Sequence, residues 1–189
     1  SGGIAAIISI SIFFVIYYLL YSKILYEYIF ISYSMFLIGA IDDLKIKVKP
    51  FKRLLIMILM LFTFIYFFQI KILNIDIPLL EFIYNNHFFS SIFTVLCFLF
   101  IINGANLIDG FNGLLSLNLI IINVILAYIN LENANLEFSL LIIAQIIILL
   151  SFLLFNFPKA KIFLGDSGAY LMGSLISLNV VITNLSLIH

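Results

Sequence analysis

The chain has 189 residues, of which 65% are hydrophobic and only 10% are charged. An ordinary soluble domain carries about 25% charged residues, so this composition excludes a water-soluble domain and indicates a polytopic membrane protein. The nine basic residues are too few for nucleic-acid binding and form no stripe. The single cysteine, Cys97, excludes a disulfide framework within the chain and a cysteine metal site.

Seven apolar segments follow one another along the chain: 4–22, 28–41, 54–69, 88–103, 114–130, 138–155 and 169–187. A helix needs about 20 residues to cross a bilayer, and most segments reach that length once their polar ends are included. Sheets and open loops cannot face lipid, so we predict an all-α polytopic membrane protein with about seven transmembrane helices in one domain, residues 1–189. The nearly alternating sequence within 70–87 predicts a short strand or hairpin.

The basic residues are unevenly distributed between two sets of connecting segments. Segments 42–53, 103–113 and 156–168 together carry seven lysines and arginines, whereas 22–27, 70–87 and 131–137 carry two. Cytoplasmic loops are enriched in basic residues, so the first set is predicted to face the cytoplasm. Four aspartates lie in the same three segments: Asp42, Asp43, Asp109 and Asp166.

The first of these segments begins with two adjacent carboxylates at the end of an apolar helix. Asp42 and Asp43 follow Gly39 and precede a basic run that includes Lys52. Adjacent carboxylates repel each other, which raises at least one pKa unless a cation is present. Mg²⁺ is typically held by one or two carboxylates plus substrate phosphates, and the lysines suit phosphate or anionic lipid headgroups. The alternative is that the aspartates end the helix and the lysines set the topology.

The second segment, 103–113, reads Asn-Gly-Ala-Asn-Leu-Ile-Asp-Gly-Phe-Asn-Gly and lies between two uncharged apolar runs. Its polar residues recur every third position, which on a helix predicts that they share roughly one face. Polar groups at membrane depth are costly and by default indicate a functional site. The alternative is a polar helix end in interfacial water. The polar residues are Asn103, Asn106, Asp109 and Asn112, and Gly110 and Gly113 allow close approach of a ligand.

The third segment contains Gly165 and Gly168, which bracket Asp166 and Ser167 immediately before the last apolar segment. This arrangement can place Asp166 on a metal and leave backbone N–H groups and Ser167 near an anion. The alternative is a glycine-rich turn in which Asp166 or Ser167 caps the following helix. Three such clusters on one membrane face predict a metal-dependent phosphoryl-transfer site, because that chemistry depends on positioning and charge neutralisation. A site built from membrane helices also predicts a lipid substrate.

These residues resemble the polyprenyl-phosphate N-acetylhexosamine-1-phosphate transferases, a family that includes the phospho-MurNAc-pentapeptide translocase and the UDP-GlcNAc:undecaprenyl-phosphate transferases. The resemblance covers nearly the whole chain. It implies an incomplete bundle that lacks the first and the C-terminal helices of a bundle of about 10–11 helices. The matching residues are Gly2-Gly3, Asp42-Asp43, Lys52, Asn103, Asn106, Asp109, Gly110, Gly113, Asn156, Pro158, Ala160, Phe163, Gly165, Asp166, Ser167 and Gly168.

The resemblance also implies roles for individual residues. Asp166 would bind Mg²⁺, or Mn²⁺ in its place, together with the donor diphosphate. Asp42 and Asp43 would lie at the metal and the acceptor phosphate, one of them as a base, and Asp109 would be the third catalytic residue. The implied substrate-binding residues are Asn103, Asn106, Asn112, Gly110, Lys52, Phe163 and Ser167.

The implied reaction moves a sugar-1-phosphate from a UDP-sugar to undecaprenyl phosphate at the cytoplasmic face of a bacterial inner membrane, with release of UMP. The sequences Asn-Phe-Pro-Lys-Ala-Lys and Asp-Gly-Phe-Asn-Gly favour the branch that starts surface polysaccharides. The alternative within the family is the phospho-MurNAc-pentapeptide transferase of peptidoglycan synthesis. The expected partners are these two substrates and the bilayer, with no nucleic acid, and a homodimer is compatible with the resemblance.

One departure from the family pattern is Asn112, which stands where the family usually has aspartate, at a position associated with the uracil pocket. An amide both donates and accepts hydrogen bonds, whereas a carboxylate only accepts, so nucleotide contacts are expected to differ. A catalytically idle homologue or a membrane transporter is the non-enzyme alternative. The CDP-alcohol phosphotransferases are a rival class, but their pattern does not continue through Gly113-Leu114-Leu115-Ser116.

Overall fold

The computed structural model of the protein describes residues 2–70, 72 and 86–186. Over these residues the chain forms seven α-helices and no β-strand. The helices are α1 (Gly2–Tyr21), α2 (Tyr26–Asp43), α3 (Pro50–Phe68), α5 (His87–Ile108), α6 (Leu114–Glu132), α7 (Leu136–Asn156) and α8 (Gly165–Ser186). Each apolar segment forms a helix, so the predicted all-α fold is confirmed. The strand or hairpin predicted within 70–87 lies outside the described residues.

Six of these helices are long and apolar enough to cross a membrane. The exception is α2, whose 18 residues include Glu27, Asp42 and Asp43. Local signals set several helix starts. Helix α3 begins at Pro50, where the N–H that proline lacks would have no acceptor within the helix. Asn86 caps α5, because its side chain accepts a hydrogen bond from Phe88 N at 3.0 Å.

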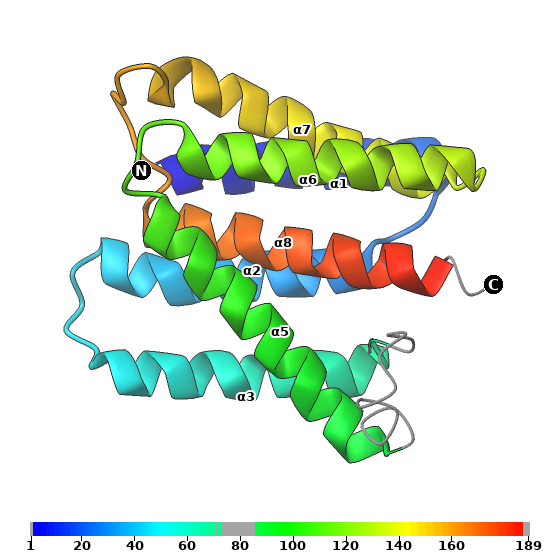
Figure 1. The fold of residues 1–189 in the computed structure, drawn as a ribbon, viewed down its shortest axis with the longest axis horizontal. Helices are drawn as coiled ribbons and strands as arrows, with labels where there is room; N and C mark the ends of the chain where they lie inside the picture. Colours follow the sequence, from blue (N-terminus) through cyan, green and yellow to red (C-terminus); the bar gives the residue numbers. More distant parts are fainter. Residues whose placement is uncertain (1, 71, 73–85, 187–189) are drawn as a thin grey trace.

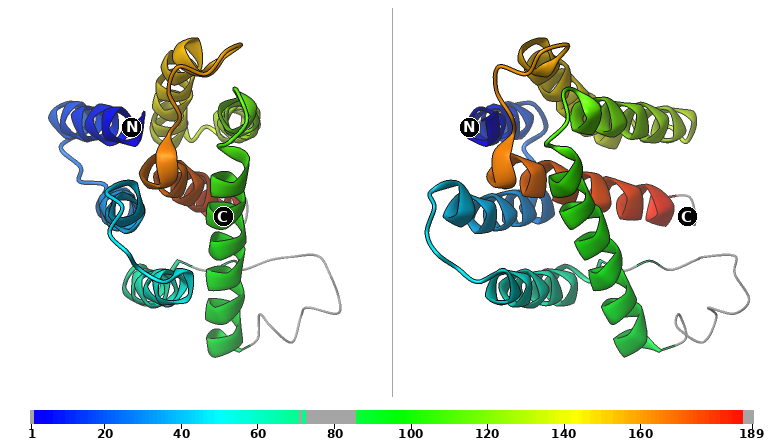
Figure 2. Two further views of the ribbon diagram at one scale, coloured as in Figure 1. Left: turned by 90° about the vertical axis from the view of Figure 1, so that its left-hand side faces the viewer. Right: turned by 60° about the vertical axis from the view of Figure 1, so that its left-hand side comes forward.

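Helix α8 is the centre of the bundle. It packs against α1, α2, α5 and α6, and Figure 2 shows it surrounded by its neighbours. Of its candidate membrane span, 78% is buried, against 22–39% for the other five spans. The position of α8 is therefore fixed by protein contacts on nearly all sides, whereas most residues of the outer helices are only partly buried or exposed.

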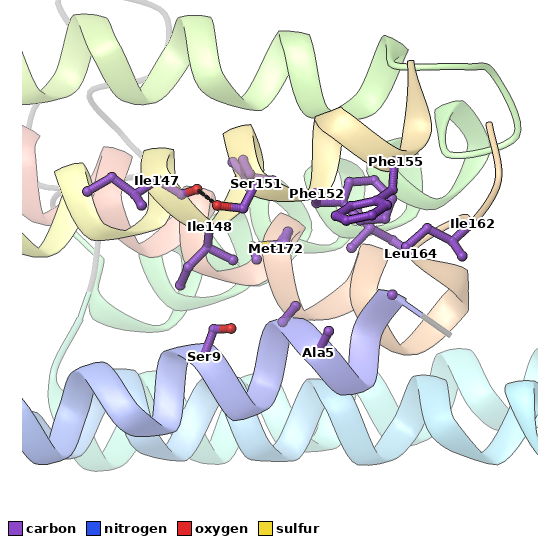
Figure 3. Close-up of a pocket in the computed structure, with 13 residues that line it drawn as sticks. Ala5, Ser9, Ile147, Ile148, Ser151, Phe152, Phe155, Ile162, Leu164 and Met172 are labelled. Atoms are coloured by element: carbon purple, nitrogen blue, oxygen red, sulfur yellow. Dashed lines mark hydrogen bonds between the residues drawn. The ribbon is translucent and has the colours of Figure 1, made fainter. Parts of the chain in front are cut away.

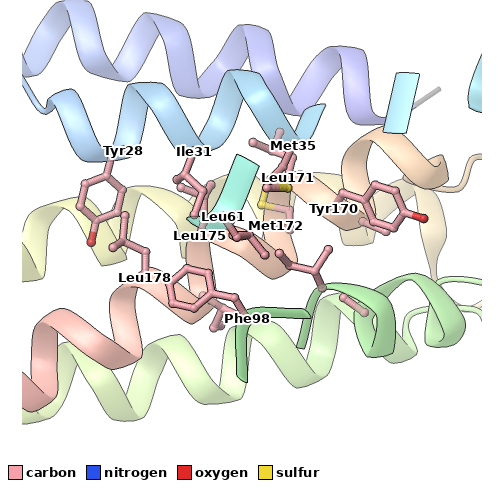
Figure 4. Packing of buried hydrophobic residues seen from close by; sticks show 14 of the residues in the cluster. Tyr28, Ile31, Met35, Leu61, Phe98, Tyr170, Leu171, Met172, Leu175 and Leu178 are labelled. Carbon is pink, nitrogen blue, oxygen red and sulfur yellow. The ribbon is translucent and has the colours of Figure 1, made fainter. Parts of the chain in front are cut away.

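Apolar side chains from α2, α3 and α5 interlock with those of α8 (Figure 4). Ile31 and Met35 of α2, Leu61 of α3 and Phe98 of α5 are each at most 1% exposed, as is Leu175 of α8. Lipid tails are as apolar as these side chains, so helix association in a membrane depends on close packing and on hydrogen bonds between helices.

A buried network centred on Asn179 supplies hydrogen bonds between helices. The Asn179 side chain accepts hydrogen bonds from Tyr28 at 2.9 Å and from Gln145 at 3.4 Å, and donates to Asn123 at 3.0 Å and to Gln145 at 2.8 Å. All four side chains are buried. The network joins α8 to α2, α6 and α7 and fixes the rotation of α8 about its own axis.

The three connections with the clustered aspartates lie at the same end of the bundle. Figure 1 shows this end on the left, where α2, α5 and α7 finish and α3, α6 and α8 begin. The connections 44–49, 109–113 and 157–164 therefore share one face, as the alternating topology predicts. That this face is cytoplasmic stays a prediction.

Candidate active site

Glycines allow the ends of α1 and α2 to pack directly on the start of α8. A Cβ atom on Gly39 of α2 would collide with the backbone of Asp166 and Ser167, and one on Gly3 of α1 would collide with Gly168. Small residues at helix contacts permit this close approach of backbones in membranes. The first turn of α8 is therefore held between α1 and the end of α2 that carries the aspartate pair.

The segment before α8 is tied to the start of α1 through the backbone. Gly2 N–H donates to the Phe163 carbonyl and Gly3 N–H donates to the Leu164 carbonyl, both at 2.9 Å. The first N–H groups of a helix have no acceptor within it, so these bonds satisfy groups that would otherwise be unpaired. The Gly2-Gly3 pair thus holds the chain that leads into the site.

Asp43 caps helix α8 from outside that helix. Its Oδ1 accepts a hydrogen bond from Asp166 N at 3.0 Å, and its Oδ2 accepts one from Ser167 N at 3.3 Å and another from the Ser167 hydroxyl. A carboxylate at a helix N-terminus satisfies free N–H groups and interacts favourably with the helix dipole. Helix α8 begins at Gly165, so Asp166 and Ser167 lie in its first turn. The alternative in which either residue caps the helix is therefore wrong, because Asp43 supplies the cap.

Asp109 directly follows α5 and holds the same helix start from another side. Its Oδ2 accepts a hydrogen bond from Gly165 N at 3.0 Å. Burial raises the pKa of the Asp109 carboxyl above its ordinary value, and the backbone N–H groups of Gly165 and Leu164 offset part of this rise. Gly165 has a φ of +73°, a backbone conformation that L side chains rarely adopt, so glycine is favoured here.

The other two aspartates share one cation. Arg53, in the first turn of α3, forms ion pairs through the same Nη1 with Asp42 Oδ2 and, at 3.3 Å, with Asp166 Oδ2. Its guanidinium carbon lies 5.6 Å from the centre of the Tyr170 ring, within cation–π range. The four aspartates thus divide into two pairs. Asp43 and Asp109 hold the start of α8, whereas Asp42 and Asp166 face a positive charge.

A pocket of about 380 Å³ opens beside these side chains. It is lined by Asn106, Asp109, Gly110, Phe163 and Asp166, all of which the sequence predicts as site residues. An added Cβ on Gly110 would meet nothing within 4 Å, so this side of the pocket is open. The lining combines two carboxylates, an amide and an aromatic side chain, which can bind a polar phosphorylated molecule when a cation is present.

Four predicted substrate-binding residues do not line this pocket. Asn103 donates to the Leu99 carbonyl at 2.8 Å within α5, and Lys52 is exposed at the start of α3. Ser167 is 1% exposed and donates to Asp43. The fourth, Asn112, lies beyond α5. The prediction that all the polar residues of 103–113 share one helical face is wrong after Ile108, because the helix ends there and a turn begins.

Two asparagines join the connections on either side of the pocket. Asn112 Nδ2 donates to the Pro158 carbonyl at 3.0 Å. Asn156 Oδ1 accepts from Gly113 N at 2.6 Å, and its Nδ2 donates to the Ile162 carbonyl at 2.7 Å. An aspartate could not make the Asn112 donation, because an ionised carboxylate only accepts. Asn112 therefore contributes to the shape of this end of the bundle.

Two residues at the site, Arg53 and Tyr170, were not predicted from the sequence. Arg53 belongs to the basic run before α3, and the sequence of this run does not show that Arg53, rather than Lys52, turns toward the aspartates. That choice depends on the rotation of α3. Tyr170 lies four residues after Asp166, a spacing that places both on one face of a helix, and this spacing was the available signal.

The donor set fits a divalent cation shared with a substrate better than a metal held by protein alone. Within residues 2–70, 72 and 86–186, no three Asp, Glu, His or Cys side chains are placed to hold a metal between them. Mg²⁺ is usually bound through one or two carboxylates together with substrate phosphates and water. Asp42 and Asp166, which already share a cation, fit that mode.

The fold and the site define a helical membrane protein with an acidic pocket at one end of its bundle. Residues 25–184 match the model of glycosyl transferase family 4, and the chain belongs to this family. This agrees with the resemblance drawn from the sequence motifs.

The chain is also similar to curated proteins named phospho-N-acetylmuramoyl-pentapeptide-transferase. The Bacillus licheniformis protein is 28% identical over an alignment of 202 positions, which covers 99% of this chain and 61% of the relative. One from Clostridium perfringens strain 13 is 26% identical over 169 residues, covering 85% of this chain and 53% of the relative. One from Leuconostoc citreum is 31% identical over 80 residues, 42% of this chain and 25% of the relative. The chain thus spans roughly half to three-fifths of the length of the Bacillus and Clostridium proteins. These names correspond to the alternative in the sequence analysis and do not support the preferred surface-polysaccharide branch.

Proposed function

We propose that the protein transfers a phospho-N-acetylhexosamine unit from a UDP-sugar to undecaprenyl phosphate at the cytoplasmic face of a bacterial membrane, and that UDP-MurNAc-pentapeptide is the donor. The observation that carries this proposal is the convergence of Asp42, Asp43, Asp109 and Asp166 from three distant segments at the start of α8. Membership in glycosyl transferase family 4 supports the reaction class. The names of the relatives support the donor.

In this reaction an oxygen of the acceptor phosphate attacks the phosphorus that carries the sugar. The bond from that phosphorus to the bridging oxygen breaks, and UMP leaves with the bond's electron pair. Catalysis of such transfers is largely positioning and stabilisation of charge. When bound, Mg²⁺ would neutralise the diphosphate and the leaving UMP, and Asp42 and Asp166 are the residues that would hold it.

The remaining residues at the site position the reactants. Asp43 and Asp109 fix the first turn of α8, so Asp166 is presented in one orientation. Asn106, Gly110 and Phe163 line the pocket where the sugar nucleotide would bind. The buried Asp109 carboxyl lies beside Asp166 at the inner wall of this pocket, where it would orient the donor. Direct substrate contacts of Lys52, Asn103, Asn112 and Ser167 stay predictions.

An apolar cavity beside the site supports a lipid acceptor. It measures about 400 Å³ and lies between α1 and α7 (Figure 3). Small residues of α1, such as Ala5 and Ser9, form one side, and Phe152 and Phe155 of α7 form the other. Leu164 lines the same cavity and directly precedes Gly165, so a lipid phosphate at the aspartates would have its isoprenoid chain directed into this cavity.

The test uses the full-length gene product, reconstituted with undecaprenyl phosphate and Mg²⁺ and supplied with a panel of UDP-sugars. UMP release and the lipid-linked pyrophosphoryl sugar are measured, with an EDTA control. Metal-dependent release from UDP-MurNAc-pentapeptide is the expected result. Release from UDP-GlcNAc alone would retain the reaction class and return the donor to the surface-polysaccharide branch. No release from any donor by folded protein would overturn the proposal.

A further inference from the structure

Arg53 occupies the space between the two carboxylates that the proposed metal would use. Its Nη1 is paired with Asp42 Oδ2 and with Asp166 Oδ2, so one side-chain atom joins α2 and α8. The Arg53 side chain is 24% exposed, and the two aspartate side chains are 17% and 32% exposed. The pairs are therefore partly shielded from water and are screened less by salt than surface ion pairs.

A guanidinium and a divalent metal cannot both occupy the gap between the same carboxylate oxygens. In the absence of a metal, Arg53 compensates the repulsion between Asp42 and Asp166 and keeps both carboxylates in place. A metal that enters this site must displace the guanidinium. Displacement leaves a half-buried positive charge without its partners, which is unfavourable unless a new anion is supplied.

The donor diphosphate is an anion of the right chemistry to supply that partner. The planar guanidinium matches phosphate oxygens through two parallel hydrogen bonds and is favoured over lysine at such sites. Asp166 is a partner of Arg53 and lines the pocket assigned above to the sugar nucleotide, so the guanidinium has only a short distance to move. Tyr170 can support the guanidinium from behind, through the ring face that it already contacts.

We propose that Arg53 is a resident cation of the Asp42–Asp166 pair which the divalent metal displaces and which then binds the diphosphate of the nucleotide donor. Metal binding and donor binding are thereby coupled through one side chain, and each strengthens the other. This inference rests on the proposed function, since it assumes a metal-dependent transfer from a nucleotide diphosphate. It assigns to Arg53 a role that neither the motif residues nor the neighbouring Lys52 fill.

The test measures metal binding directly and does not depend on turnover. Full-length protein in detergent is titrated with Mn²⁺, and free Mn²⁺ is followed by electron paramagnetic resonance with and without UDP, after subtraction of a protein-free Mn²⁺–UDP titration. The variants are Arg53→Gln and, as a control with the same change in charge, Lys49→Gln, whose side chain is exposed just before α3. In the wild type and in Lys49→Gln, UDP should lower the Mn²⁺ dissociation constant by at least about fivefold, the lower end of typical coupling between sites.

Arg53→Gln should bind Mn²⁺ several-fold more tightly than the wild type without UDP, because the competing cation is gone, and UDP should then change the dissociation constant less than about twofold. Arg53→Lys keeps the charge but loses the planar fork, so it should bind Mn²⁺ like the wild type without UDP and show weaker coupling; it tests the proposal if the glutamine variant does not fold. Unchanged or weaker Mn²⁺ binding by Arg53→Gln, with wild-type binding intact, would overturn the Arg53 proposal alone. Wild-type protein that binds no Mn²⁺ in either condition would overturn both it and the metal-dependent function.

Discussion

The capping of α8 by Asp43 leads to a prediction with a defined magnitude. Asp43→Ala removes an acceptor of three hydrogen bonds, two from backbone N–H groups of α8 and one from Ser167. Loss of a helix cap costs about 1 kcal/mol, within a range of about 0.5–2 kcal/mol. The Ser167 hydroxyl, which is 1% exposed, would lose its acceptor, and an unsatisfied buried group costs about 1–3 kcal/mol. The variant should therefore lose about 2–4 kcal/mol of unfolding free energy.

The assay is reversible unfolding of the full-length protein in mixed micelles with increasing SDS, followed by far-ultraviolet circular dichroism. Asp43→Asn is the matched variant, because its one amide oxygen replaces only one of the two carboxylate oxygens that accept these bonds, and its Nδ2 donates instead of accepting. It should lose at least about 0.5–1.5 kcal/mol, the net contribution of a typical hydrogen bond, and less than Asp43→Ala. Ser167→Ala in the Asp43→Ala background should cost little more, because both changes remove the same bond. Equal stability of Asp43→Ala and the wild type would refute the capping role, and full additivity of the two alanine changes would refute the Asp43–Ser167 coupling.

Three further predictions follow from contacts around the site. Gly39→Ala should destabilise the protein by about 1–3 kcal/mol, because its added Cβ would meet the α8 backbone. Gly104→Ala, with nothing within 4 Å of the added Cβ, should be neutral or stabilising. Equal SDS-unfolding midpoints for the two variants would contradict the close packing of α2 on α8. Burial raises the pKa of Asp109, so its protonated form is favoured in the folded state and its contribution to stability is present below the unfolded pKa of about 3.9 and lost as pH rises through the raised pKa. Asp109→Asn should thus be more stable than the wild type at pH 7 and equal to it near pH 3.5, while transfer activity falls; a stability gain independent of pH would exclude this explanation. Ala5→Trp should fill the cavity between α1 and α7 and raise the KM for undecaprenyl phosphate more than that for the UDP-sugar, whereas Leu154→Trp, on an exposed side chain of α7, should change neither. A normal KM for the lipid in Ala5→Trp would contradict a lipid site in this cavity.

The helices could be predicted from the sequence because each depends on a continuous apolar run, which is a local property. Segment 28–41, the shortest of the seven, also forms a helix, and that helix extends to Asp43. The start of the last helix was misplaced for a physical reason. The predicted apolar segment began at residue 169, but α8 begins at Gly165 because carboxylates from α2 and from the end of α5 cap it. Local sequence cannot show a cap that another helix supplies.

The acidic residues of the candidate site could be predicted from the sequence, but the ion pairs that they form could not. The three polar segments indicated that the four aspartates would share one face, and the structure brings them to one helix start. Which two of them face a cation depends on the rotation of α3, which places Arg53 and not Lys52 toward the carboxylates. The contact between Asn112 and the Pro158 carbonyl joins residues 46 positions apart and had no local signal either.

The central claim is that Asp42 and Asp166 hold the metal of a phospho-sugar transfer. The most direct measurement is the rate of UMP release from UDP-MurNAc-pentapeptide by the full-length protein with undecaprenyl phosphate, as Mg²⁺ is increased, for the wild type and Asp166→Asn in parallel. The wild type should turn over only with Mg²⁺, and Asp166→Asn should be at least about 100-fold slower at every Mg²⁺ concentration while it unfolds at the wild-type SDS concentration. Turnover by Asp166→Asn at the wild-type rate, or wild-type turnover that EDTA leaves unchanged, would contradict the claim.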